Sequence, residues 1–152
     1  MGTGYKRPES ALVVIHTPDL QILLLERAKH PGYWQSVTGS REKDESFLET
    51  AIREVREETG LDIRRDQLRV WPGENVYTIM PEWRHRYAPE VTHNHERVFS
   101  LCVPAPCDIQ TAPEEHRAWR WLPCEEAAAA CFSASNREAI LALKNTPLDH
   151  AS

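Results

Sequence analysis

Two apolar runs near the start of the chain are rich in aliphatic and β-branched residues, ALVVIH at 11–16 and QILLLER at 21–27. Such runs favour strands, and the connection TPDL contains Pro-Asp, which favours a turn, so the pair predicts a β-hairpin. A shorter run, WQSVTG at 34–39, ends at a glycine and predicts a third strand. Strand-like runs then recur along the chain: LRVW (68–71), VYTIM (76–80), VFSLCVPA (98–105) and WRWLP (119–123).

The segment that follows the third strand has a helical period instead. We predict a helix from about Ser46 to Thr59, with Asp44 or Ser46 as its N-cap. Gly60 supplies the stop, because glycine readily takes the left-handed conformation that ends many helices. The apolar positions form one stripe at helical spacing: Leu48, Ala51, Ile52, Val55 and Thr59.

Two more helices are predicted near the C-terminus, CEEAAAACF at 124–132 and SNREAILALKN at 135–145, the second capped by Ser135. Strands mixed with one central and one or two terminal helices are typical of a layered α/β sandwich with a mixed sheet. At 152 residues the chain has the size of one domain, and we expect residues 1–152 to form it.

Composition excludes several classes of partner. The formal net charge is −5, which disfavours nucleic acid and anionic membranes as main partners, yet a small anionic ligand is compatible with a local cluster of cations. The N-terminus lacks the apolar core of a signal peptide and no apolar run is long enough to span a membrane. The four cysteines form no C-x-x-C pair, so we expect free thiols in a cytoplasmic protein, either a monomer or a small homo-oligomer.

The predicted central helix carries an unusual cluster of acids. Glu54, Glu57 and Glu58 fall at spacings i, i+3 and i+4, so they share one side of the helix and repel one another. They also crowd its C-terminal half, where the helix dipole disfavours anions. A solvated helix with i,i+4 ion pairs is the alternative, but carboxylates grouped in this way suit Mg²⁺ or Mn²⁺. Arg53 is placed to orient a carboxylate or to meet a phosphate.

At this point the sequence resembles the Nudix hydrolase family. The pattern is Gly39, five residues, Glu45, seven residues, then Arg53-Glu54-Val55-x-Glu57-Glu58-x-Gly60-Leu61. The resemblance implies a Nudix fold, an α/β/α sandwich in which this box forms loop–helix–loop. It also implies Mg²⁺-dependent hydrolysis of a pyrophosphate linkage, with Mn²⁺ as a substitute. By the resemblance, the metal ligands are Glu54, Glu57, Glu58 and the Gly39 carbonyl, and the catalytic residues are Glu54, Arg53 and Glu57.

The box does not name a substrate, but WRHRYAPEVTHNH at 83–95 is informative. Arg84, Arg86 and Tyr87 combine cations with an aromatic ring, which suits a triphosphate joined to a flat heterocycle, although an ordinary exposed loop is the alternative. Thr38, next to Gly39, is placed to bond a phosphate.

Further motifs are YKRP (5–8), LLLER (23–27), WQSVTGS (34–40), RHRYAP (84–89), EEH (114–116) before WRWL, and SNREAI (135–140). Through these motifs, residues from about 5 to 140 are similar to a bacterial branch of the family that releases pyrophosphate from 7,8-dihydroneopterin 3′-triphosphate in folate biosynthesis. That similarity implies a small-molecule triphosphate as partner, with Lys6, Arg27, Thr38 and Ser133 near the substrate and Glu115 as an additional metal ligand. Two alternatives stay open at this point, a (d)NTP pyrophosphohydrolase of the house-cleaning type and a non-catalytic nucleotide-binding Nudix domain.

Overall fold

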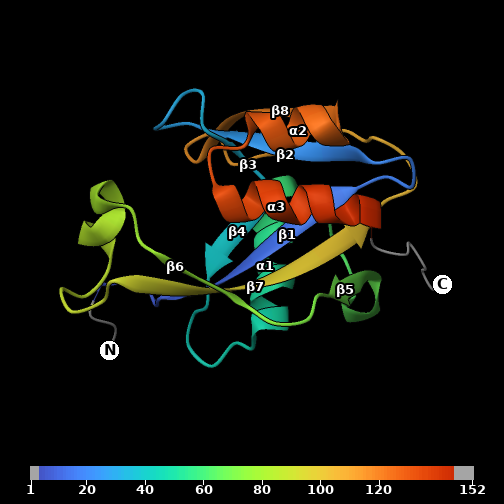
Figure 1. Cartoon of the computed structure of the whole chain (residues 1–152). Coiled ribbons are helices and arrows are strands. Elements are labelled where there is room, and N and C mark those ends of the chain that lie inside the picture. Colours follow the sequence, from blue (N-terminus) through green and yellow to red (C-terminus); the bar gives the residue numbers. More distant parts are fainter. Residues whose placement is uncertain (1–3, 146–152) are drawn as a thin grey trace.

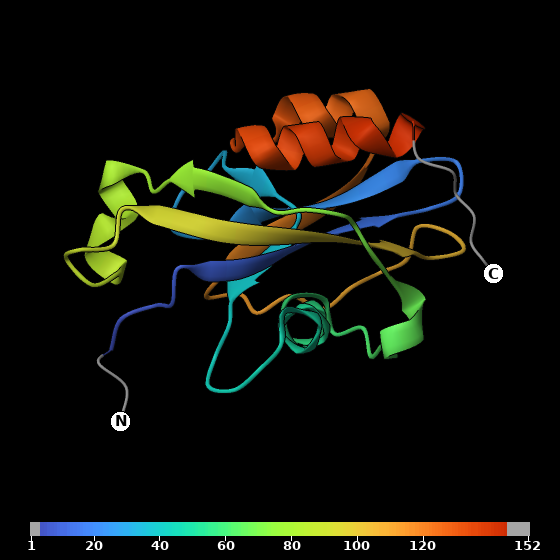
Figure 2. The ribbon, with the colours of Figure 1, turned by 60° about the horizontal axis from the view of Figure 1, so that its bottom comes forward.

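The computed structural model describes residues 4–145, which form three layers. Figure 2 shows α1 (Phe47–Thr59) on one side of the sheet, with α2 (Cys124–Ala130) and α3 (Ala134–Ala142) on the other. This arrangement confirms the predicted α/β/α sandwich. The strands are β1 (Glu9–His16), β2 (Gln21–Arg27), β3 (Trp34–Gln35), β4 (Val37–Ser40), β5 (Leu68–Val70), β6 (Asn75–Thr78), β7 (His93–Cys102) and β8 (His116–Pro123), and short 3-10 helices are η1 (Arg65–Gln67), η2 (Pro81–Arg86) and η3 (Leu143–Asn145).

The sheet is mixed, as predicted. Its main path runs β3-β2-β1-β7-β5, while β4 pairs with β1, β6 with β7 and β8 with β2. Strands β1 and β7 are parallel, and the other pairings between these named strands are antiparallel. The β1–β2 hairpin opens beyond its turn, so the start of β1 pairs with β4 instead (Figure 1). Strand β4 therefore lies beside β1, where α1 covers it.

A hydrophobic core lies on each side of the sheet because side chains alternate along β1 and β2. Leu12, Val14 and Leu24 pack with α2 and α3, whereas Val13 and Leu25 face α1. Full burial of such a side chain contributes about 1.5–3 kcal/mol, so both helical layers are held mainly by these contacts.

Several strand boundaries differ from the sequence-based prediction. The run at 34–39 forms two strands rather than one, because β3 pairs with β2 while β4 pairs with β1. Strand β7 begins at His93 rather than at residue 98, since its polar first half pairs with both β1 and β6.

The cap of α3 also differs. Ser133, not Ser135, is the N-cap, and its hydroxyl accepts from the Asn136 backbone N–H. The prediction of free thiols is confirmed for all four cysteines. Among residues 4–145, no helix combines the length and apolar character needed to cross a bilayer.

Candidate active site

Helix α1 is fixed at both ends by its own sequence. Ser46 is the N-cap within a capping box, in which its side chain and that of Glu49 each accept from the other's backbone N–H. Gly60 ends the helix at φ 78°, the left-handed region that favours glycine. Ala51 and Val55 are fully buried against the sheet, as the apolar stripe predicted. These contacts set the rotation of α1 and so decide which way its acids point.

The side chains of Glu54 and Glu58 lie together beside β4, near Thr38 and Gly39. The Glu58 side chain is 4% exposed and that of Glu54 is 12% exposed. Burial, a hydrogen bond to Glu54 and the negative charges of Glu54 and Glu115 raise the pKa of Glu58, while the Thr38 backbone bonds to the same carboxyl. Burial also raises the pKa of Glu54. Glu58 Oε1 is buried with no hydrogen-bond partner within the described residues. Arg53 pairs with Glu54 at 3.0 Å, but two buried carboxylates in contact remain costly unless a further cation joins them.

Gly39 allows this approach. A Cβ atom at Gly39 would lie 2.0 Å from Glu54 Oε2 and 2.1 Å from its Cδ, so any larger residue would displace the carboxylate. The close contact of strand and acid is the reason for glycine here, since Gly39 pairs regularly with Ala11 in the sheet. The first glycine of the sequence pattern is therefore explained by the space that the Glu54 carboxylate needs.

Arg53 orders the acids around it. Its guanidinium donates to the Ser40 carbonyl at 2.9 Å, to Glu54 at 3.0 Å and to Glu57 at 3.2 Å, and it binds Glu45 through two nitrogens. Hydrogen bonds from Arg53 lower the pKa of Glu45 to about 2. Five contacts from one planar group fix the orientation of Glu54 relative to β4.

The four acids predicted as metal ligands are not all assembled. Glu57 has a 55% exposed side chain that is turned toward Arg53, and Glu115 is exposed but close enough for its charge to act on Glu58. Across residues 4–145, no three His, Cys, Asp or Glu side chains are placed together to hold a metal ion. The preformed part is the pair Glu54 and Glu58. Its unmet oxygen and raised pKa values fit a divalent cation.

Three predicted substrate residues gather opposite this acid pair. Lys6 and Arg86 are joined through the backbone, since Lys6 N–H donates to the Arg86 carbonyl at 2.8 Å. Desolvation and the positive charges of Arg86 and Arg27 lower the pKa of Lys6, while Glu54 and Glu58 raise it. Desolvation and Arg86 likewise lower the pKa of Arg27, whose buried Nε has no partner within the described residues. Like charges crowded in this way favour binding of an anion.

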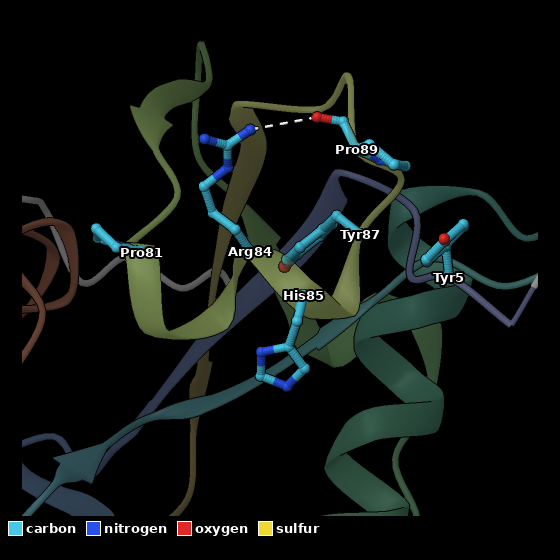
Figure 3. Close-up of a pocket in the computed structure, with 6 residues that line it drawn as sticks. All are labelled: Tyr5, Pro81, Arg84, His85, Tyr87 and Pro89. Atoms are coloured by element: carbon cyan, nitrogen blue, oxygen red, sulfur yellow. Dashed lines mark hydrogen bonds between the residues drawn. The ribbon is translucent and has the colours of Figure 1, made fainter.

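Other predicted contacts lie at the edge of this group. Arg84 and Tyr87 line an open cleft of about 480 Å³. The Arg84 guanidinium donates to the carbonyl of Pro89, which lines the same cleft, at 3.3 Å (Figure 3). Tyr87 is the link to the cations, because Lys6 Nζ lies 6.0 Å from its ring centroid. Thr38 is half-buried beside Glu58, and the Ser133 hydroxyl is engaged as the α3 cap.

Sequence reasoning missed two groups that support the site. Gln35 accepts from Arg27 at 3.4 Å and lies 3.4 Å from His116, whose ring lies 3.9 Å from Glu58. Burial and the charge of Arg27 lower the pKa of His116 to about 4, so the ring is neutral. The Arg27 guanidinium also stacks 5.1 Å from the centroid of Trp83. The sequence did offer one signal for these two residues, which is that each lies close to a predicted site residue. Gln35 is near Thr38, and His116 follows Glu115.

Trp83 belongs to an aromatic cluster that the sequence did not reveal. His30, Tyr33 and Phe132 surround it, with centroid distances to Trp83 of 5.7, 6.3 and 5.5 Å. These rings come from separate parts of the chain and tie η2 to the β2–β3 and α2–α3 connections. Arg86, at the end of η2, is thereby held near Lys6.

Comparison with known proteins agrees with this geometry. The chain is 44% identical to the dihydroneopterin triphosphate diphosphatase of Escherichia coli (strain K12) over 139 residues, 90% of this chain and 91% of that protein. It is 39% identical to the enzyme of the same name from Haemophilus influenzae, over 90% of this chain and 87% of the relative.

Solved structures show the same relationship. The structure of the E. coli dihydroneopterin triphosphate pyrophosphohydrolase superposes with a TM-score of 0.87 at 42% identity, covering 93% of this chain and 99% of that one. A C. elegans Ap4A hydrolase shares the fold at 20% identity, with a TM-score of 0.68. The NUDIX domain model matches residues 6–143, which contain the acid pair, Gly39 and the cation group. The chain belongs to the NUDIX domain family.

Proposed function

We propose that this protein hydrolyses 7,8-dihydroneopterin 3′-triphosphate to dihydroneopterin monophosphate and pyrophosphate, as a Mg²⁺-dependent enzyme of folate biosynthesis. The observation that carries the proposal is the group of cations facing two buried carboxylates, Lys6, Arg27 and Arg86 opposite Glu54 and Glu58. A triphosphate with its metal matches both charge signs at once. The high identity to enzymes named dihydroneopterin triphosphate diphosphatase supports the choice of substrate.

Nudix hydrolases generally use divalent metal ions, and the donor set here suits Mg²⁺, with Mn²⁺ as a substitute. Glu54 and Glu58 would hold the ion, with Glu57, Glu115 and the Gly39 carbonyl as the remaining protein ligands. When bound, such an ion neutralises charge on phosphate oxygens and lowers the pKa of a coordinated water.

The chain's own residues then have distinct tasks. Lys6, Arg27 and Arg86 bind the phosphates and hold them against the acid pair, and Thr38 contacts them from β4. Glu54 accepts the proton of the attacking water, because Arg53 orients its carboxylate beside β4 and a carboxylate is a suitable base for this step. Arg53 keeps that carboxylate in one orientation through its contacts with Glu54 and the Ser40 carbonyl.

The remaining predicted residues lie further out. Arg84 and Tyr87 line the cleft beside Lys6, where they contact the part of the substrate beyond the phosphates. Ser133 is the N-cap of α3 and directly follows Phe132 of the aromatic cluster.

The test is a substrate panel with pyrophosphate release as the readout. Dihydroneopterin triphosphate should give the highest kcat/KM, with weaker turnover of dNTPs, since the triphosphate and metal supply much of the recognition. Glu54→Gln and Glu58→Gln should lower kcat by about 10²–10⁴-fold, the range for loss of a proton-transfer group. Glu126→Gln, an exposed change on α2, is the matched control and should have no effect. Faster turnover of a dNTP than of the pterin compound would overturn the proposed substrate.

A further inference from the structure

A patch of buried polar side chains lies on the sheet face toward α3. Ser10 pairs with Glu96, and Asn94 pairs with Tyr77 on the neighbouring strand, so their side chains share one face. Ser10, Asn94 and Glu96 are 6%, 2% and 3% exposed, while Tyr77 is 39% exposed and lies over them. We call these four residues the polar floor. A hydrophobic sheet face would pack better here, so these buried polar groups call for a functional explanation.

Asn94 has an unmet hydrogen-bonding group. Its Nδ2 donates to Ser10 Oγ at 2.8 Å and to the Tyr77 hydroxyl at 3.0 Å. Its Oδ1 is buried and has no partner within the described residues. A buried acceptor left unsatisfied costs roughly 1–3 kcal/mol. A ligand that supplies an N–H group to this oxygen recovers that cost.

Glu96 is a buried carboxylate with only neutral partners among the described residues. It accepts from Asn75 Nδ2 at 3.1 Å and bonds the Ser135 side chain, and burial raises its pKa. Asn75 and Ser135 also line a cleft of about 240 Å³ with Trp71 and Val98. Glu96 is therefore separated from the open cleft by the Asn75 and Ser135 side chains that bond it. A cavity of about 150 Å³ accommodates benzene, so the adjoining space is sufficient for a bicyclic ring.

The register of the sheet sets the distance from the polar floor to the phosphates. Ser40 on β4 is opposite Ser10 on β1, which is opposite Glu96 on β7. Neighbouring strands are about 4.8 Å apart, so Glu96 is roughly 10 Å from β4 in the plane of the sheet. Its side chain lies on the α3 face, whereas Gly39 and Glu54 meet on the α1 face. The described pairing of β1 with β2 is near their turn, at His16 and Ile22, so a ring joined to a triphosphate by a short carbon chain can reach both faces between these strands.

We propose that the polar floor is the subsite for the substrate's ring, in which Glu96 and Asn94 accept hydrogen bonds from the 2-amino-4-oxopyrimidine edge. This inference rests on the proposed function, because it assigns the ring of the same substrate. A pterin presents a ring N–H and an adjacent amino group, which match the two oxygens of a carboxylate. Guanine carries the same edge, whereas adenine presents an acceptor where Glu96 needs a donor.

The experiment compares three substrates on wild type and Glu96→Gln. We expect kcat/KM for dihydroneopterin triphosphate and for GTP to fall roughly 10- to 100-fold, the size of a lost paired hydrogen bond at a specificity site. That for ATP should stay unchanged or rise, because glutamine can donate to the adenine acceptor. Glu126→Gln, an exposed change on α2 away from this cleft, is the matched control and should alter none of the three. An equal loss on all three substrates would mean that Glu96 is only structural.

A second measurement needs no variant. The Asn94 side-chain amide of the wild-type protein should shift in an NMR titration with GMP and not with AMP. No shift with either compound would overturn the subsite. The two proposals fail separately: slow turnover of dihydroneopterin triphosphate rejects the proposed substrate, whereas the ratio of GTP to ATP turnover still tests the polar floor.

Discussion

Gly39→Ala tests whether the acid pair depends on the close approach of β4. The added Cβ would lie 2.0 Å from Glu54 Oε2, while ordinary contact begins near 3.4 Å, so the carboxylate must retreat by about 1.4 Å. Misplacement of a catalytic group by about 1 Å can cost 10²-fold in rate. We therefore expect kcat to fall at least 100-fold, about 2.7 kcal/mol of transition-state stabilisation.

The fold should tolerate the same change. Gly39 has an ordinary strand conformation, and the clashing atoms belong to the end of a flexible side chain. Alanine also reduces the entropy of the unfolded chain, so Tm should be unchanged or slightly higher. Pyrophosphate release and thermal unfolding separate the two effects. Gly73→Ala is the converse control, because it has open space but a φ of 76°, and it should lose stability and keep kcat. Activity within threefold of wild type in Gly39→Ala would refute the assigned role of Glu54.

Further predictions concern charge and stacking. Glu45→Gln should lower the free energy of unfolding by roughly 1–3 kcal/mol at neutral pH by removing the partner of Arg53. Because the folded pKa of Glu45 is depressed from 4.5 to about 2, this difference should vanish as pH falls from about 4.5 toward 2; a constant difference in denaturant melts would contradict it. Glu58→Gln should leave the Tm of chelator-treated protein unchanged or raised and abolish the gain from Mg²⁺, about 2.7 kcal/mol at 100 times Kd in wild type. Trp83→Leu should raise KM roughly 2- to 30-fold with little change in kcat, because it removes the ring beneath Arg27; an unchanged KM would argue against Arg27 as a phosphate ligand.

The local parts of the fold were predictable from the sequence because their causes are local. The stripe containing Ala51 and Val55 fixed the buried face of α1, and Ser46 and Gly60 fixed its ends. The split at Ser36 was not predictable, since it arises when adjacent residues pair with different strands. The α3 cap was misplaced by two residues for a related reason. Ser133 and Ser135 are both good caps in sequence, but the preceding residue, Phe132, bonds to the Trp34 carbonyl of β3, and the helix starts after Ser133.

The candidate site likewise has a part that the sequence predicts and a part that it does not. The spacing of Glu54 and Glu58 follows from helix geometry, so their proximity could be predicted. Glu57 is on the same helix but is directed toward Arg53, which spacing alone does not determine. Lys6, Arg27 and Arg86 come from three separate segments of the chain, so local patterns do not predict that they lie close together. Lys6 and Arg27 were predicted as substrate residues only through the resemblance to known enzymes. The family pattern contains no information on the aromatic ties that hold η2 in place.

The unsatisfied polar groups of the structure connect these observations. Within the described residues, the buried side-chain atoms without a partner belong to Arg27, Glu58, Asn94, Arg97 and His116. Three of these five residues surround the proposed phosphate and metal site, and a fourth forms the proposed ring subsite. Native proteins leave few such groups unpaired, because each costs free energy in the folded state. Four of the five thus lie where the proposed substrate, with its phosphates and ring N–H groups, would supply the missing hydrogen bonds.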